Sequence, residues 1–460
     1  MDLITLNEVF GISRTVPANY VERTDVELRF LQALGRGQHV VLHGSSKQGK
    51  TCLRKWMLAR DQHIVITCAN RWTLGDIHSA ILKLAGYTVE QSTSRTSGGE
   101  HKIVAKWAQA AEIGSERVIG QYREVVRAPL ELDPFDVNDI IRALAEIGFN
   151  KYIVLEDFHY LPHEVQQDFA VALKAFHESA DHCFVVIGVW LEANRLVQFN
   201  GDLTGRVQSI DADAWTREQL RQAITNGERL LNVEFPAHFV EELLDHCCDS
   251  IWVVQEVCRT VCELAGVLAT QTEPLPLRPS RSVPDLVRMV VDTQTARFAT
   301  FVSGFAAGFG STDLEMYKWL LAAVLVSEPE MLTAGLTYQD LKRFVEQHHP
   351  LRPINPGNLT HALKSVTTLQ VTRCMINPIV LDYDQSLRKL TVVDRGFLIW
   401  LGRQDIEDLL DQADLPAAFV RDWRRGRTIG AHALPAGGRM ATWTPQPGMT
   451  ATPPPINSGR

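Results

Sequence analysis

Residues 40–58 read VVLHGSSKQGKTCLRKWML, and this stretch decides the fold. An apolar run stops at Gly44, four small or polar residues follow, and Gly49, Lys50 and Thr51 then open an amphipathic stretch typical of a helix. The glycines let the backbone turn tightly and aim consecutive N–H groups inward, where they can bind phosphate oxygens. The helix that begins after the loop adds the positive end of its dipole. The residues therefore predict a phosphate-binding loop between a buried strand and a helix.

The loop fits the pattern GxxxxGK followed by Ser or Thr in full. Lys50 is expected to bridge the β and γ phosphates of a nucleotide, and the Thr51 hydroxyl is expected to hold Mg²⁺. The alternative is an accidental glycine loop, but the strand-like run before it and the helix-like run after it match the required context. No NKxD or TKxD motif for guanine follows, so ATP is the expected nucleotide. The predicted nucleotide-binding residues of the loop are Gly44, Ser45, Ser46, Lys47, Gln48, Gly49, Lys50, Thr51 and Cys52.

A pair of carboxylates ends another apolar run, KYIVLEDFHYL at 151–161. A phosphate loop that works with Mg²⁺ needs one carboxylate for the metal shell and one that orients water for hydrolysis. By position, Glu156 is expected to contact Mg²⁺ or its waters, and Asp157 is expected to polarise the attacking water. The alternative is two solvated carboxylates at the end of a strand. The shorter aspartate at the water-activating position predicts slow hydrolysis, which suits a switch better than a motor.

The composition is that of a globular chain without a generally basic surface. The 460 residues are 45% apolar, and 46 Lys and Arg against 54 Asp and Glu give a net charge of −8. The eight cysteines form no CxxC pair and are expected to be reduced core residues. The N-terminus has no signal-peptide pattern, and no apolar run reaches the roughly 18 residues that span a bilayer. We therefore expect a soluble cytoplasmic protein with no membrane partner.

Short apolar runs alternate with helical patterns in residues 1–212, which predicts an α/β core with a parallel sheet and helices on both faces. An insert at about 87–130 interrupts this alternation, and we expect a hairpin there, with strands at 102–107 and 118–126 and a loop at 92–99. The expected strands are 39–43, 63–68, 152–155, 183–189 and 207–210, and the expected helices are 52–60, 74–84, 137–147 and 164–179.

Four further regions follow the core. Three helical patterns in residues 213–266 predict a small lid. The pattern of residues 267–310 predicts a Pro-rich linker at 271–284 and one connecting helix at 285–305. Residues 311–405 show three helices followed by a strand pair, the pattern of a winged helix, with its third helix at 356–369. Residues 406–460 hold a basic segment at 421–430 and then a Pro/Gly/Thr-rich tail that is expected to be disordered.

The segment ANYVERTDVELRFLQALGRGQHVVLHGSSKQGKT (18–51), together with the lid pattern, resembles the AAA+/STAND-type P-loop ATPases, in the neighbourhood of origin-recognition-like and bacterial signalling ATPases. The resemblance implies that residues near Tyr20 and Val21 pack on adenine. It also implies that Arg206, in LTGRVQSIDAD (203–213), is an arginine finger that reaches the γ-phosphate of a neighbouring subunit. The alternative for Arg206 is a structural role at the start of a strand.

The same resemblance locates the two nucleotide sensors of the family. Sensor 1 falls near Val189 or Trp190, where no usual polar sensor residue is evident. Sensor 2 falls near Trp252 and Val253, where that family often has an arginine.

A winged helix often places its third helix in the DNA major groove, and it can instead dock a protein. The polar candidates for contacting duplex DNA are Asn358, His361 and Lys364 on the third helix, and Arg388 and Lys389 on the hairpin.

Motifs for other chemistry, such as GxSxG and HExxH, are absent from the sequence. Three hypotheses remain open. The first is an ATP-dependent switch that assembles as a homo-oligomer and controls a separate effector, with bacterial defence as the setting by family analogy. The second is an initiator- or loader-type ATPase that binds DNA through the winged helix. The third is a nucleotide-binding scaffold with little turnover.

Overall fold

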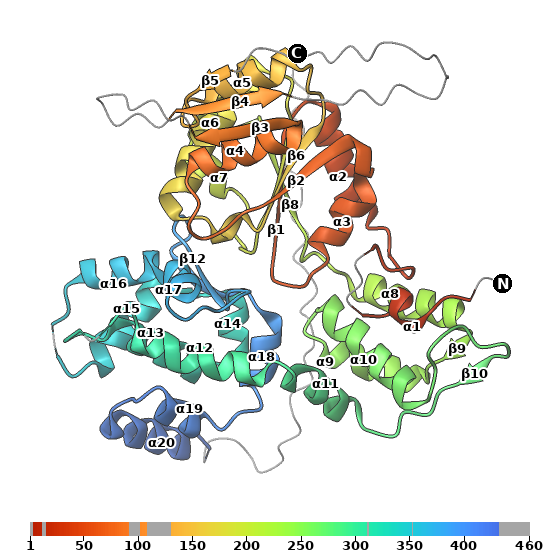
Figure 1. Ribbon diagram of the computed structural model, residues 1–460. Helices are drawn as coiled ribbons and strands as arrows, with labels where there is room; N and C mark the ends of the chain where they lie inside the picture. Colours follow the sequence, from red (N-terminus) through yellow and green to blue (C-terminus); the bar gives the residue numbers. More distant parts are fainter. Residues whose placement is uncertain are drawn as a thin grey trace, which may run out of the picture.

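The computed structural model describes residues 3–11, 15–91, 102–107, 130–310, 312–351 and 353–431 (Figure 1). In this view a sheet flanked by helices lies above, one group of helices lies below it on the right, and a second group lies below it on the left. No helix within these residues is both long and apolar enough to cross a bilayer.

A parallel sheet of five strands forms the centre of the upper part, in the order β2-β6-β7-β1-β8. The predicted α/β fold with a parallel sheet is therefore confirmed. Parallel strands end at the same edge, so this order brings the loop after β1 and the carboxylates at the end of β6 to one edge, on either side of β7. The strands are β1 (His39–His43), β2 (His63–Thr67), β6 (Tyr152–Glu156), β7 (Phe184–Ile187) and β8 (Val207–Asp211).

Both faces of the sheet are buried because helices cover each of them. Successive side chains of each strand point to opposite faces. Val41 packs with α4, α5 and α6, while Val40 and Leu42 pack with α2 and α3 on the other face. The helices expected at 52–60, 74–84, 137–147 and 164–179 are confirmed. The helices of the core are α2 (Thr24–Gly35), α3 (Lys50–Met57), α4 (Leu74–Ala85), α5 (Val137–Glu146), α6 (His163–Ser179) and α7 (Arg195–Phe199), with 3-10 turns η1 (Arg60–Gln62), η2 (Phe158–Tyr160) and η3 (Gly201–Leu203).

The insert forms a second, antiparallel sheet in the order β3-β4-β5. Its strands are β3 (Tyr87–Gln91), β4 (Ile103–Trp107) and β5 (Leu130–Leu132). The strand expected at 102–107 is β4, and its partners are β3 and β5, at the two ends of the insert. The strand expected at 118–126 and the loop at 92–99 lie outside the described residues.

The lid contains the three predicted helices, α8 (Arg217–Leu231), α9 (Ala237–His246) and α10 (Ile251–Leu264). The single connecting helix expected at 285–305 is wrong, because the chain forms α11 (Val283–Asp292) and α12 (Thr295–Ala307). Gln294 leaves the helical region with φ −107° and ψ 0°. The chain turns there because α11 packs on α9 and α10, whereas α12 packs on α13. The N-terminal helix α1 (Leu6–Val9) and the short strands β9 (Val233–Glu234) and β10 (Leu275–Pro276) complete this part.

The C-terminal unit, α12 to α20, holds the helices and the strand pair predicted at 311–405, with β12 and β13 joined by β11 in one small antiparallel sheet. The helix expected at 356–369 is two helices, because Ser365, with φ −98° and ψ 4°, separates α16 from α17. The basic segment at 421–430 lies in α20, and the tail from 432 lies outside the described residues. The remaining elements are α13 (Met316–Val326), α14 (Pro329–Ala334), β11 (Leu336–Thr337), α15 (Tyr338–His348), α16 (Pro356–Lys364), α17 (Val366–Thr372), β12 (Leu381–Asp384), β13 (Lys389–Val392), α18 (Arg395–Leu401), α19 (Ile406–Gln412) and α20 (Ala417–Ala431).

The C-terminal unit is held against the carboxyl edge of the parallel sheet by an apolar cluster and a buried ion pair. Val189, just after β7, packs with Val371, Ile379 and Val393. Beside this cluster the buried Arg195 guanidinium pairs with the Asp382 carboxylate of β12. Because the phosphate-binding loop lies at the same edge, the C-terminal unit is placed next to it.

Candidate active site

The loop of residues 44–51, called the P-loop below, has a backbone that requires glycine at two positions. Gly44 has φ +133° and Gly49 has φ +83°, a region that side chains disfavour. A Cβ atom on Gly44 would also lie 2.5 Å from Asp213 Oδ1. The glycines of the motif therefore serve the turn that sends β1 into α3.

The N–H groups at the start of the P-loop differ from those at its end and in the first turn of α3. Those of the first three residues bond inside the protein: Gly44 N donates to Trp190 O at 2.8 Å, Ser45 N to Asp213 Oδ1 at 2.7 Å, and Ser46 N to Val393 O at 2.9 Å. In the part of the chain that the structure describes, the N–H groups of residues 49–52 have no acceptor. They surround the first turn of α3, where a helix favours an anion.

Lys50 is buried at the base of this turn. Its Nζ donates to Gly44 O at 2.9 Å and to Ser45 O at 2.5 Å, so it bridges the two ends of the P-loop. Burial lowers the pKa of the Lys50 ammonium to about 8, although three nearby aspartates oppose this shift. The side chain is thus a desolvated cation held beside the free N–H groups, ready to bind an anionic oxygen.

The two predicted carboxylates meet different partners. Glu156 accepts a hydrogen bond from Arg54 Nη2 at 2.8 Å, and the Arg54 Nη1 atom lies 3.1 Å from His63 Nε2. Asp157 has φ +58° and begins the turn η2. Burial and then Glu156 raise the pKa of Asp157, and Lys50 opposes this rise. Of the two carboxylates, Asp157 is the one that interacts electrostatically with Lys50, while Glu156 is paired with Arg54.

Sequence reasoning missed Arg54 and Asp213. Arg54 follows Lys50 by one helical turn on α3, so its spacing already indicates that both face the carboxylate strand. Asp213 follows β8, whose carboxyl end lies beside that of β1, so sheet order would have indicated it once the order was known. Besides capping Ser45 N, Asp213 accepts a hydrogen bond from the Ser45 hydroxyl.

A cavity of about 500 Å³ opens over the P-loop. Tyr20 and Val21 are among its lining residues, and the Tyr20 ring stacks on Trp56 with 4.8 Å between ring centroids. Residues of the lid also line the cavity, as does Pro378 of the C-terminal unit. Its lining includes Ser46, Lys47, Gln48, Gly49, Lys50, Thr51, Cys52, Glu156, Asp157, His159, Tyr160, Val189, Trp215, Ile251, Trp252 and Gln255.

The positions expected for the two sensors, near Val189 or Trp190 and near Trp252 and Val253, carry no arginine. Val189 lines the cavity, and Trp190 is fully buried with its ring near Phe158. At the lid, Trp252 lies beneath the ammonium of Lys47, with 3.9 Å between Nζ and the ring centroid. Lys47 Nζ also donates to Gln294 Oε1, directly before α12, at 2.6 Å.

Arg206 lies at the edge of the sheet opposite the P-loop. Its carbonyl accepts a hydrogen bond from His39 N at the start of β1, and its guanidinium pairs with Glu178 at 2.8 Å. The five residues of β1 span about 17 Å at about 3.3 Å per residue, so Arg206 cannot reach the cavity of its own chain. A role toward a neighbouring subunit stays a prediction.

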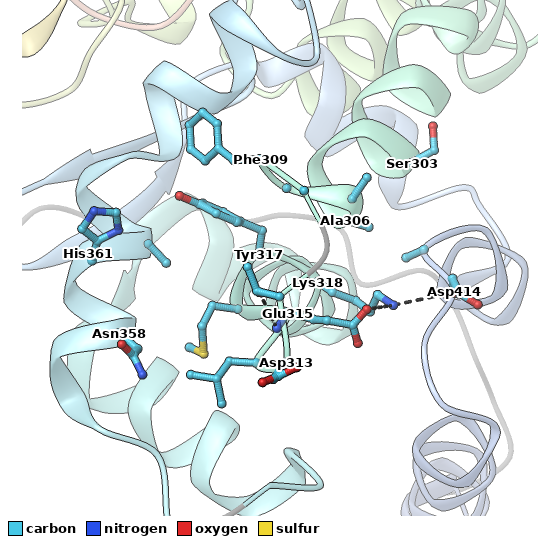
Figure 2. A pocket seen from close by; sticks show the side chains of 18 of the residues that line it. Ser303, Ala306, Phe309, Asp313, Glu315, Tyr317, Lys318, Asn358, His361 and Asp414 are labelled. Carbon is cyan, nitrogen blue, oxygen red and sulfur yellow. Dashed lines mark hydrogen bonds and ion pairs between the residues drawn. The ribbon is translucent and has the colours of Figure 1, made fainter.

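The five predicted DNA-contacting residues are not brought to one place. Asn358 and His361 line a cavity of about 760 Å³ within the C-terminal unit, where Asp313 and Glu315 also lie (Figure 2). Lys364 instead lines a narrow gap toward the core.

The two hairpin candidates lie in a third place. Arg388 rests over the Tyr338 ring at 4.0 Å, and Lys389 Nζ donates to Ala334 O at 3.2 Å. The positive charges of the five candidates are therefore divided over separate surfaces.

Comparison with known proteins finds similarity only among solved structures. No protein-family model and no curated protein sequence matches this chain. A Walker-type ATPase of Pyrococcus abyssi aligns with 11% identity over 86% of this chain and 100% of its own, with a TM-score of 0.48. The ORC1 protein of Aeropyrum pernix, solved in complex with DNA, aligns with 13% identity over 91% and 98% and a TM-score of 0.42.

The RuvB Holliday junction branch migration motor of Thermotoga maritima is a third similar structure, with 13% identity over 84% of this chain and 96% of its own and a TM-score of 0.34. All three TM-scores lie below 0.5, so the functional argument rests on the geometry of the cavity.

The close approach of Asp213 to Gly44 yields a test of the loop. Gly44→Ala should destabilise the protein more than Gly37→Ala, which also has positive φ but no atom within 4 Å of the added Cβ. The control should cost about 1–2 kcal/mol of unfolding free energy from φ alone, and the clash at Gly44 should add about 1–3 kcal/mol. Urea unfolding of the two variants measures the difference, and equal costs would contradict the described contact.

Proposed function

We propose that this protein binds ATP with Mg²⁺ in the cavity over the P-loop, hydrolyses it slowly, and uses the bound nucleotide as a switch that controls oligomerisation and a separate effector. The observation that carries this proposal is the convergence of four free N–H groups at 49–52, the Lys50 ammonium and Asp157 on one cavity with aromatic and apolar walls. This donor set fits the charge and the shape of a polyphosphate.

Each residue has a distinct task in this proposal. The N–H groups of 49–52 hold the β-phosphate, and Lys50 turns from its loop carbonyls toward the β and γ oxygens. The Thr51 hydroxyl and Glu156 hold the Mg²⁺ shell, and Asp157 orients the attacking water. Bound Mg²⁺ supplies neutralisation of the charge that develops on the phosphate oxygens. Tyr20 and Val21 contact the base.

Two features support slow turnover. Asp157 is one methylene shorter than a glutamate at the position that orients water. Glu156 is engaged by Arg54, so its carboxylate has to be shared between an arginine and the metal shell. A protein that holds ATP for long periods serves as a timer, and this supports the switch over a motor.

The contacts between the C-terminal unit and the P-loop support the switch hypothesis. Val393 accepts the N–H of Ser46, and Gln294 accepts a hydrogen bond from Lys47. Arg395, at the start of α18, lies 3.5 Å from the Asp213 carboxylate that caps Ser45. Phosphate binding that shifts the P-loop therefore acts on the same residues that hold the C-terminal unit. We propose that this shift frees the unit to recruit an effector, and that Arg206 contacts the nucleotide of a neighbouring subunit in the assembly.

The alternative is an initiator-type function. We propose that residues 311–405 form a winged helix, and in this alternative the winged helix binds duplex DNA. Its candidates Asn358, His361, Lys364, Arg388 and Lys389 lie on separate surfaces, so it needs a rearrangement of the C-terminal unit. A salt-dependent shift of duplex DNA that Lys364→Glu abolishes would favour this alternative. A scaffold without turnover is the third candidate, and the Arg54–Glu156 pair is the contact that favours it.

The nucleotide site is tested by Lys50→Ala, with Lys83→Ala on the exposed end of α4 as the control. The loss of a buried cation that contacts two phosphates should lower the affinity for Mg·ATP about 100-fold or more, whereas the control should bind as the wild type does. Isothermal titration with the full chain measures both affinities. Retained ATP binding by a folded Lys50→Ala variant would remove the site assignment.

Turnover is tested by Asp157→Asn, because asparagine tolerates the positive φ of this position and only the charge is lost. The variant should bind ATP but hydrolyse it at least about tenfold more slowly, and it should accumulate in the ATP-bound assembly on size-exclusion chromatography. Unchanged turnover and unchanged assembly relative to the wild type would instead support the scaffold.

A further inference from the structure

The cavity of about 760 Å³ in the C-terminal unit, called the C-terminal cavity below, has no role in the proposed nucleotide function. Cavities that bind ligands typically measure about 300–1,000 Å³. The lining comes from the end of α12 and the loop after it, the start of α13, α16 and the loop after α19. The cavity is therefore a candidate binding site, and its lining indicates the chemistry of the ligand.

Part of the lining is apolar and aromatic. The Phe309 side chain is exposed although it is large and apolar, and its ring centroid lies 5.7 Å from that of Tyr317. The small side chains of Ala306, Ala362 and Ala413 line the same cavity. An aromatic pair beside small apolar residues suits a ligand with a large apolar side chain.

The rest of the lining is mainly acidic. Asp313, Glu315 and Asp414 line the cavity, and Lys318 is the one lysine or arginine among its described lining residues (Figure 2). Lys318 Nζ donates to Glu315 Oε1 at 2.7 Å and to Asp414 Oδ2 at 3.2 Å. Asp313 has neither a hydrogen bond nor an ion pair within the described residues. The carboxylates exceed the ammonium by two charges, so the lining favours a cationic ligand.

The chain itself contains a segment of matching chemistry. Residues 439–443 read RMATW, which places a cation close to two large apolar side chains. Residues 432–460 contain no Asp or Glu, so the segment is flanked by no charge that the acidic lining would repel. RMATW therefore complements the C-terminal cavity both in charge and in apolar character.

The length of the chain allows this segment to return to the cavity. Helix α20 begins at Ala417, three residues after Asp414 of the lining, and it ends at Ala431. Its 15 residues span about 22 Å at 1.5 Å per residue. An extended chain from 432 to 439 reaches up to about 28 Å. Arg439 can therefore return along the full length of α20 to the cavity.

We propose that residues 439–443 bind in the C-terminal cavity of the same chain. The Arg439 guanidinium pairs with the Asp313 carboxylate, which forms strong charge-assisted hydrogen bonds. The Trp443 ring packs against the exposed ring of Phe309. Little intrinsic affinity is needed, because the short connection keeps the segment at a millimolar effective concentration.

The bound segment controls access to part of the proposed winged helix. Asn358 and His361, two of the predicted DNA-contacting residues, line the same cavity (Figure 2). Any partner that contacts these two side chains has to displace the segment first. This role does not depend on nucleotide binding at the P-loop.

Photo-crosslinking of the full chain tests where the segment binds. Benzoylphenylalanine replaces Trp443, and in the control it replaces Met449, which lies outside the segment. After irradiation the variant at position 443 should form crosslinks within one chain to peptides that contain residues 306–317 or 358–362, as mass spectrometry would show. The control should form none to these peptides.

Hydrogen exchange of the full chain at low ionic strength tests the two contacts. Arg439→Glu and Trp443→Ala should each raise the exchange rate at residues 306–317 roughly tenfold. Arg460→Glu makes the same charge change outside the segment and should leave this rate within about twofold. Asp313→Arg combined with Arg439→Glu exchanges the two charges and should restore most of the protection.

Three results would overturn the inference. The crosslinks from position 443 could be absent or lie outside the cavity. The exchange rate at 306–317 could stay unchanged in both Arg439→Glu and Trp443→Ala. The crosslinks could also join two chains without forming within one, and this outcome would assign the cavity to the tail of a second copy.

Discussion

Hydrogen bonds to residues far along the chain fix the P-loop. The arrangement of the sheet and the C-terminal unit around the loop depends on these bonds. Asp213, after the last strand of the sheet, holds the N–H and the hydroxyl of Ser45. Val393, in the C-terminal unit, holds the N–H of Ser46. These acceptors satisfy the first part of the loop, whereas the N–H groups of residues 49–52 have no acceptor in the described part of the chain. The loop cannot change its shape without acting on both contacts.

The cavity is a joint product of three parts of the chain. The parallel sheet supplies the P-loop and Asp157, the lid supplies Trp252, and the C-terminal unit supplies Pro378. The lid and the C-terminal unit also share one continuous apolar core, so they are braced against each other as well as against the sheet. A ligand that fills this cavity would therefore contact all three of these parts.

The sequence predicts the local features well because they follow from short-range rules. The five strands, the P-loop and the carboxylates at 156 and 157 each follow from periodicity or from a motif. The breaks at Gln294 and Ser365 were missed because they follow from packing between helices, which periodicity does not contain. The same holds for the partner of Ser46, which lies 347 residues away. Arg54 was within reach of sequence reasoning, since it lies one helical turn after Lys50, whereas the C-terminal cavity can be seen only in the folded chain.

Nucleotide bound at the P-loop is proposed to alter the hold on the C-terminal unit. Hydrogen exchange of the full chain with and without Mg·ATP, read by mass spectrometry, tests it most directly. Slower exchange is expected at residues 44–52, where phosphate covers the free N–H groups, and faster exchange is expected at residues 376–395, where the unit is released. Protection at 44–52 with unchanged exchange at 376–395 would contradict the claim.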